Sequence, residues 1–248
     1  MGSIERIFVA GATGAIGRIL CRLLVADGHA VIGATRSTEK TAALKALGVE
    51  PVVVDVFDAA RLREVLIDSR AEIVIHQLTD LPPGLDPAKM ADARIRNARL
   101  REVGTGNLVA AAVGAGVKRV IAQSIALAYA PGTMPFVETA PLNVGAADDV
   151  SAMSARAVAS LEQQVLNGPF EGIVLRYGKL YGPGTGFDKA PTGGPVHVDA
   201  AADAARLAVT KGAAGIYNIA VEDGIVSCAK ARAAFGWNPA FRISTGQR

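Results

Sequence analysis

Apolar positions along the chain form short runs that alternate with longer segments of amphipathic pattern. The short apolar runs predict strands at residues 7–10, 30–35, 51–54, 72–75, 118–123, 172–176 and 215–220. The amphipathic segments predict helices at residues 18–26, 38–47, 59–68, 87–115, 151–166, 199–211 and 227–235. This alternation predicts an α/β fold of the Rossmann type, a doubly wound parallel sheet with helices on both faces. Ligands of such sheets bind at the carboxyl ends of the strands.

Two segments, 126–150 and 178–194, are rich in glycine, proline and other turn residues, and predict loops over the ligand cleft. No repeat, low-complexity tract or clean linker divides the chain. We therefore expect one compact body over residues 1–248.

A glycine-rich segment joins the first predicted strand to the first predicted helix and reads Gly-Ala-Thr-Gly-Ala-Ile-Gly. Strand, glycine turn and helix form the usual context of a dinucleotide site: one glycine permits the turn, one lets a pyrophosphate approach, and one lets helix and strand pack. Unpaired N–H groups and the helix dipole attract the phosphates. The alternative is an ordinary structural turn. On the first interpretation the cofactor contacts are Gly11, Thr13, Gly14, Ala15, Ile16 and Gly17.

The end of the second predicted strand indicates which dinucleotide is preferred. Arg36 follows this strand, with Ser37 beside it and Lys40 one turn further on, and no carboxylate precedes Glu39. A guanidinium and two further donors suit the 2′-phosphate of NADP(H), whereas NAD(H) sites usually carry an acid here. Alternatively, Arg36 stacks on adenine or lies in solvent, and NAD(H) would serve.

Residues after the third and fourth predicted strands fit the same pocket. Asp55 and Val56 are placed to face adenine, with the Asp55 carboxylate near its amino group. Leu78 and Thr79 are placed to line the ribose–nicotinamide side.

Charge adds little to this picture. The chain of 248 residues has a net charge of +3, but its basic residues are scattered among acids. The densest basic run, Arg94, Arg96, Arg99 and Arg101, is interpreted as a solvated helix face, so no nucleic-acid partner is expected.

Targeting and metal signals are also missing from the sequence. We expect a cytoplasmic protein without a membrane segment, because no long apolar stretch or signal peptide is visible. The two cysteines, Cys21 and Cys228, lie far apart and indicate buried thiols with no metal site.

Six motifs occur in an order typical of one superfamily. They are Gly11 to Gly17, Asp55 to Asp58, Gly104 to Ala112, Lys118 to Ser124, Leu175 to Gly184, and Val196 to Asp199. Together they resemble the extended short-chain dehydrogenase/reductase superfamily, in its NAD-dependent epimerase/dehydratase branch. The resemblance spans nearly the whole chain and is more specific for fold and cofactor than for reaction or substrate.

The resemblance implies a dinucleotide-binding part over about residues 1–170 and a reduced substrate-binding part over about 171–248. It implies cofactor contacts from Gln123, Tyr177 and Gly178 and a small-molecule substrate. It also implies a homodimer paired through the helices near 87–115 and 151–166. Both C-terminal connections are shorter than is usual in the family, which makes a large sugar nucleotide a less suitable substrate.

The family's proton-transfer dyad, Tyr-x-x-x-Lys, is missing. Ser124 matches the family's serine, but alignment on Glu162 puts Ser154 and Val158 where the tyrosine and lysine belong. None of the four tyrosines has a lysine four positions on. The tyrosines that could replace the missing phenol are Tyr181, Tyr177 and Tyr129, with Lys179 or Arg176 as the neighbouring cation.

Two functions follow from this departure. The first is an NADP(H)-dependent oxidoreductase that acts on a small carbonyl, alcohol or imine with a non-standard proton donor. The second is a cofactor-binding protein without hydride transfer, such as a redox sensor, a regulatory subunit or a non-redox cyclase or lyase. His76, His197 and Trp237 are interpreted as structural residues.

Overall fold

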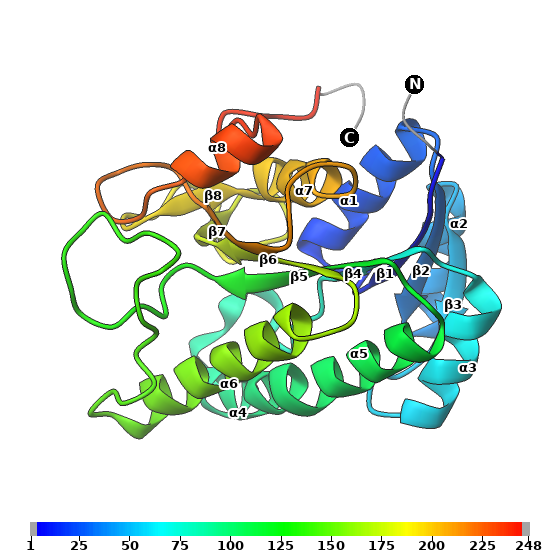
Figure 1. Cartoon of the computed structure of the whole chain (residues 1–248), viewed down its shortest axis with the longest axis horizontal. Coiled ribbons are helices and arrows are strands. Elements are labelled where there is room, and N and C mark those ends of the chain that lie inside the picture. The colour runs from blue at the N-terminus through cyan, green and yellow to red at the C-terminus, as the bar shows by residue number, and fades with distance from the viewer. Residues whose placement is uncertain (1–3, 245–248) are drawn as a thin grey trace.

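The computed structural model of the protein describes residues 4–244, and at its centre lies a seven-stranded parallel sheet (Figure 1). The strands lie in the order β3-β2-β1-β4-β5-β6-β9. Their bounds are β1 Arg6–Ala10, β2 Ala30–Thr35, β3 Glu50–Val53, β4 Ile73–His76, β5 Arg119–Ile125, β6 Glu171–Tyr177 and β9 Gly215–Ile219. The predicted α/β class and doubly wound parallel sheet are confirmed. The strand order reverses between β1 and β4, which is where such a sheet opens a crevice for ligands.

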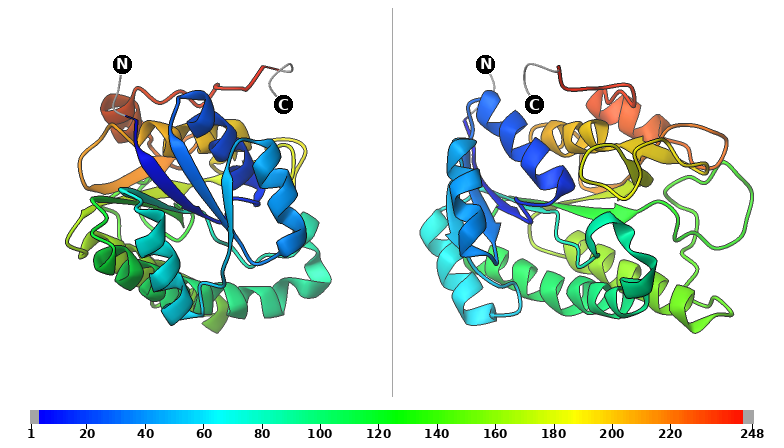
Figure 2. Two further views of the ribbon diagram at one scale, coloured as in Figure 1. Left: turned by 90° about the vertical axis from the view of Figure 1, so that its right-hand side faces the viewer. Right: turned by 180° about the vertical axis from the view of Figure 1, so that it is seen from behind.

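Helices cover both faces of the sheet, which explains why its strands are apolar on both sides (Figures 1 and 2). One layer contains α1 Ala15–Ala26, α2 Thr41–Ala46, α7 Val198–Leu207 and α8 Ala229–Phe235. The other contains α3 Ala59–Ser69, α4 Met90–Arg99, α5 Thr105–Gly114 and α6 Asp149–Leu166. Each layer buries its own cluster of apolar side chains against the sheet, with Leu20 in the first and Leu161 in the second. The helices α4 and α6, through which we expect a homodimer, lie side by side in the second layer (Figure 1).

The long helix predicted at 87–115 is divided. It begins with a 3₁₀ turn at Pro87–Lys89, continues as α4, widens into a π-helical turn at Leu100–Gly104, and resumes as α5. A side chain at Gly104 would place its Cβ 2.8 Å from Leu100 Cδ1, so glycine lets the widened turn pack closely. Single π turns inside helices are frequent at functional sites.

The sequence predicted a loop over residues 178–194, but part of this segment is a strand. Its first residues form β7, Lys179–Tyr181, which pairs in parallel with β8, Pro195–His197. A three-residue strand whose partner lies 16 positions away leaves no periodic pattern in the sequence. The other predicted loop projects beyond α6 at one end of the molecule (Figure 1).

Within residues 4–244, no helix has both the length and the apolar character needed to cross a membrane.

Candidate cofactor and active site

The glycine-rich turn between β1 and α1 is shaped by backbone contacts that only glycine permits. Gly11 has a φ of +87°, and a Cβ there would lie 2.6 Å from the Gln77 carbonyl oxygen. A Cβ at Gly17 would lie 2.1 Å from the Gly11 carbonyl oxygen. Gly14 precedes α1 and provides no side-chain cap, so the first-turn N–H groups receive no side-chain acceptor from that position. This arrangement suits an anion at the positive end of α1.

A cleft of about 1000 Å³ lies along the carboxyl ends of the strands and begins at this turn. Most of the predicted site residues line it: Gly11, Thr13, Gly14, Ala15, Arg36, Ser37, Lys40, Val56, Leu78, Thr79, Gln123, Ser124, Tyr177 and Gly178. Other predicted residues are not part of its lining: Ile16, Gly17, Asp55, Tyr129 and Tyr181.

One end of the cleft carries the basic residues predicted to bind a 2′-phosphate. Arg36 and Lys40 are exposed there, and neither forms an ion pair with an acid of residues 4–244. The Ser37 hydroxyl donates to Glu39 at 2.7 Å. Asp55 turns back on its own loop, where its carboxylate accepts a hydrogen bond of 2.9 Å from the Phe57 N–H.

The other end of the cleft lies beyond β4, β5 and β6. The Gln123 side chain donates to the Leu78 carbonyl at 2.5 Å and joins two of the loops there. Gln77, which the sequence reasoning missed, donates to the Tyr177 hydroxyl at 3.2 Å. Gln77 is only 6% exposed, and its Oε1 has no hydrogen-bond partner in the described part of the chain. Gln77 lines the cleft, so its buried acceptor lies beside a space that could hold a donor of a ligand.

Behind this end of the cleft is a buried polar network. The Ser124 hydroxyl donates to Glu162 at 2.7 Å. Arg176 binds both oxygens of the same carboxylate, at 2.8 and 2.6 Å, and a third N–H of its guanidinium donates to Tyr129 at 2.9 Å. Tyr129 in turn donates to Asn218 at 2.6 Å. The sequence signal for this network was a single charge in the predicted strand 172–176 and a single charge on the inner face of α6.

The three candidate tyrosines are therefore in different settings. Tyr129 is held inside the network, where burial raises its pKa despite the charge of Arg176. Tyr177 lines the cleft but is 2% exposed, and burial raises its pKa well above that of a free tyrosine. Tyr181 accepts a hydrogen bond of 2.9 Å from Arg242 and packs its ring against His197.

The two candidate cations have other partners. Arg176 binds Glu162, and Lys179 donates to the Thr192 carbonyl at 2.8 Å. Neither is placed to act as the lysine of the family's dyad does, which is to lower the pKa of a phenol on the cleft.

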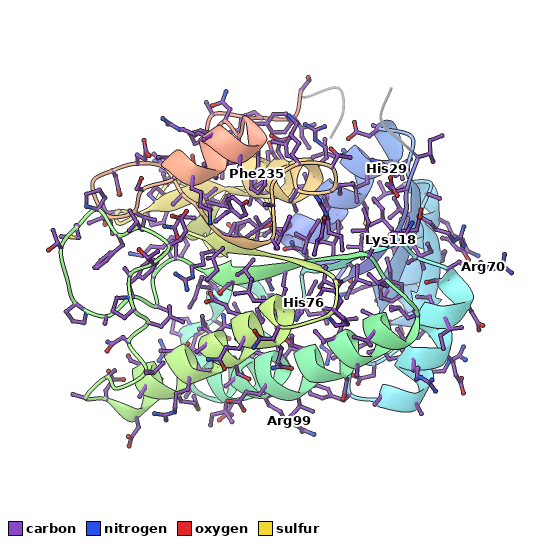
Figure 3. All side chains as sticks on the ribbon, in the orientation of Figure 1. His29, Arg70, His76, Arg99, Lys118 and Phe235 are labelled. Atoms are coloured by element: carbon purple, nitrogen blue, oxygen red, sulfur yellow. The ribbon has the colours of Figure 1, made fainter. Side chains whose placement is uncertain are left out.

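The interpretation of the basic run as a solvated helix face is wrong for one residue. Arg94, Arg96 and Arg99 are exposed, and Arg99 points outward from the helix layer (Figure 3). Arg101 instead lines the cleft, where burial lowers its pKa to about 10. It lies four residues after the buried Asn97 and so shares the inward edge of the helix, a position that its charge concealed in the sequence.

The residues interpreted as structural are confirmed in that role. His76 lies between the sheet and the helices below it, with Nε2 3.0 Å from the Thr105 hydroxyl (Figure 3). Burial, helped by the charge of Arg101, lowers its pKa to about 4. His197 accepts from the Asp199 N–H at the start of α7, and Trp237 donates to the Ala200 carbonyl.

A family model described as NAD(P)H-binding matches residues 11–181, which is more than half of the chain. The chain belongs to this NAD(P)H-binding family. A Streptomyces protein, 3-diazoavenalumate denitrifying reductase, is 40% identical over 234 residues, with 86% of this chain and 75% of that protein covered.

Solved structures of UDP-glucose 4-epimerases share the fold of this chain. The UDP-glucose 4-epimerase of Thermotoga maritima superposes with a TM-score of 0.77 at 20% identity, covering 95% of this chain and 94% of that one. The UDP-glucose 4-epimerase of Thermus thermophilus, solved in complex with NAD, gives a TM-score of 0.74 at 20% identity, covering 98% and 96%.

The residues of the cleft fit the dinucleotide that the family binds. Gly14 carries no side chain and no side-chain cap, which leaves the start of α1 open to a phosphate. Arg18, Arg36 and Lys40 add positive charge along the same wall. When bound, the cofactor would be held by these groups at its phosphates and by the loops after β4, β5 and β6 at its nicotinamide end.

Proposed function

We propose that this protein is an NADP(H)-dependent reductase that removes a diazo group, as dinitrogen, from a small organic acid. The observation that supports this proposal most is that the hydroxyl groups near the nicotinamide end of the cleft are poorly placed to give a proton to a substrate. Ser124 donates to Glu162, Tyr129 donates to Asn218, and Tyr181 is outside the cleft lining. Tyr177 remains, but its raised pKa suits it poorly to exchange a proton near neutral pH.

Loss of a diazo group needs no proton at the reacting carbon. When bound, NADPH would supply a hydride to the carbon that carries the diazo group, so that a C–H bond forms while the C–N bond breaks and its electron pair leaves with dinitrogen. A diazonium acid and NADPH thus give the hydrogen-substituted acid, dinitrogen and NADP⁺, with charge and atoms balanced. Ser124 directs its proton to Glu162, so the lone pairs of its oxygen are available to a cationic diazonium group. The 40% identical relative is named for a reduction of this kind.

The preference for NADP(H) is supported by the basic end of the cleft. Arg36 and Lys40 have no acidic partner among residues 4–244, and both line the cleft. Their charges would complement a 2′-phosphate, whereas NAD(H) would leave them unpaired.

A small carbonyl, alcohol or imine is the second candidate substrate, and the position of Tyr177 on the cleft favours it. That reaction would need Tyr177 to act as proton donor without a neighbouring cation. Cofactor binding without hydride transfer is the third candidate.

Deuterium transfer tests the proposal. The protein would be supplied with diazotised aminobenzoates and aminocinnamates and with NADPH that carries deuterium on one or the other face of C4. We expect dinitrogen release equal to NADPH consumed, with deuterium delivered from one face only to the carbon that lost nitrogen. An enzyme-free reaction is the control, because diazonium salts also oxidise NADPH in solution without facial preference.

The outcomes separate the candidates. Reduction that matches the enzyme-free rate and uses both faces equally would contradict the proposal. NADPH consumption with aldehydes, ketones or imines instead would support the carbonyl reaction, and consumption with none of these compounds would support cofactor binding alone.

A further inference from the structure

Arg101 stands at the junction of the cleft and a second cavity. It belongs to the π-helical turn after α4 and lines the cleft. Its Nη1 lies 3.5 Å from the hydroxyl of Ser154 on α6. Ser154 lines a smaller cavity of about 170 Å³, and Ile125 lines both spaces. Arg101 on the cleft and Ser154 on the smaller cavity thus connect the linings of the two spaces.

The charge of Arg101 is not compensated by a carboxylate. No acid of residues 4–244 lies within ion-pair distance of it, whereas its neighbour Arg96 pairs with Asp80 at 3.5 Å. The charge of Glu162 acts on Arg101, but both oxygens of that carboxylate are bound by Arg176. The guanidinium is half-buried and makes one long side-chain hydrogen bond, to Ser154, among residues 4–244, so most of its five N–H groups are available.

We propose that Arg101 and Ser154 bind the carboxylate of the substrate. The planar guanidinium fork matches a carboxylate, and the Ser154 hydroxyl offers one more donor beside it. The phosphates of the cofactor have their own cations at the glycine turn and at Arg36. Ser154 occupies the position at which the family resemblance places the catalytic tyrosine, so an anion site replaces a proton-transfer group there. The substrate class rests on the proposed function, while the anion site itself does not.

Two probes without a diazo group test this site. The affinities of 4-hydroxycinnamate and of its methyl ester would be measured by calorimetry on protein saturated with NADP⁺. The ester keeps the shape of the acid and lacks its charge. We expect the wild type to bind the acid about tenfold more tightly than the ester, as charged hydrogen bonds of this kind contribute.

Variants show whether Arg101 is the source of the preference for the acid over the ester. Arg101→Gln should abolish the preference for the acid and leave the affinities for the ester and for NADP⁺ unchanged, and Arg101→Lys should keep part of it. The matched control is Arg94→Gln, because Arg94 is an exposed arginine of the preceding helix. Equal binding of acid and ester by the wild type, or binding of neither, would overturn the inference. So would a loss of NADP⁺ affinity in Arg101→Gln as large as the loss for the acid, since Arg101 would then serve the cofactor.

This outcome is independent of turnover. If deuterium transfer fails but the preference for the acid depends on Arg101, the proposed function is wrong and the anion site stands. If deuterium transfer succeeds equally with esters, the anion site is wrong and the reductase stands.

Discussion

The Ser124 hydroxyl donates its proton to the Glu162 carboxylate over 2.7 Å. A hydroxyl has one proton, so this bond leaves Ser124 only lone pairs for a ligand in the cleft. Glu162 is fixed in turn by two hydrogen bonds from Arg176. The relationship therefore assigns the buried acid a structural task and makes Ser124 an acceptor toward the cleft.

The Glu162–Arg176 pair should be important for stability, because both side chains are at most 4% exposed. Glu162→Leu would leave the guanidinium buried without its partner, and we expect the free energy of unfolding to fall by about 3–5 kcal/mol. Urea denaturation followed by circular dichroism measures this. The double variant Glu162→Leu/Arg176→Met should recover most of the loss, and a double variant as unstable as the single would contradict the explanation.

Phenylalanine substitutions test whether the reaction proceeds without a tyrosine as proton donor. With a diazonium acid as substrate, Tyr177→Phe, Tyr129→Phe and Tyr181→Phe should each keep the rate of hydride transfer within roughly threefold of wild type. General acid catalysis typically contributes about 10²–10⁴-fold, so a loss of that size would identify the tyrosine as a proton donor. Single-turnover oxidation of NADPH is the measurement, and thermal melting shows that each variant is folded.

Arg36 should determine the choice between the two dinucleotides. Arg36→Ala should weaken NADP⁺ binding by about 10–100-fold and change NAD⁺ binding little, because only NADP⁺ carries the 2′-phosphate. Fluorescence titration with both cofactors checks this. Lys45→Ala is the control, since Lys45 is an exposed cation on α2 that does not line the cleft. Equal losses for the two cofactors would show that Arg36 does not bind the phosphate.

Gly17 should tolerate no side chain. In Gly17→Ala the new Cβ would fall 2.1 Å from the Gly11 carbonyl oxygen, which is fixed backbone. We expect the free energy of unfolding to fall by about 2 kcal/mol or more, with loss of NADP⁺ affinity as the turn is displaced. Gly145→Ala is the matched control, because a Cβ there would meet nothing within 4 Å. Comparable stability of the two variants would contradict the packing role of Gly17.

His76 should make stability depend on pH. Its pKa is about 4 in the folded protein and near 6.5 when unfolded, so the unfolded chain binds more protons between these values. The contribution of His76 to stability therefore falls as pH falls from 6.5 to 4, by about 3 kcal/mol in total. Urea denaturation at a series of pH values should show a smaller decline for His76→Gln than for wild type. Parallel curves for the two proteins would mean that folding does not lower the pKa of His76.

Much of the fold and the cofactor loop could be predicted from the sequence. Alternating apolar and amphipathic segments determine local strand and helix formation. Gly11 has a positive φ that favours glycine, and Gly17 allows a close backbone approach that a Cβ would prevent. The seven parallel strands and the turn at Gly11 were predicted for these reasons. The position of Arg36 was also predictable, because this residue directly follows β2 in the sequence.

The tertiary structure decided which polar side chains meet. Glu162 and Arg176 come from α6 and β6, and Tyr129 finds Asn218 at a separation of 89 residues, so no local pattern encodes either contact. Arg101 has the charge of its exposed neighbours, and only the packing of its helix against the cleft separates it from them. The sequence alone thus determined the backbone of a dinucleotide site. Long-range packing decided which polar side chains pair with one another and which charged side chains line the cleft, because hydrogen bonds form between groups that are close in space, whatever their separation along the chain.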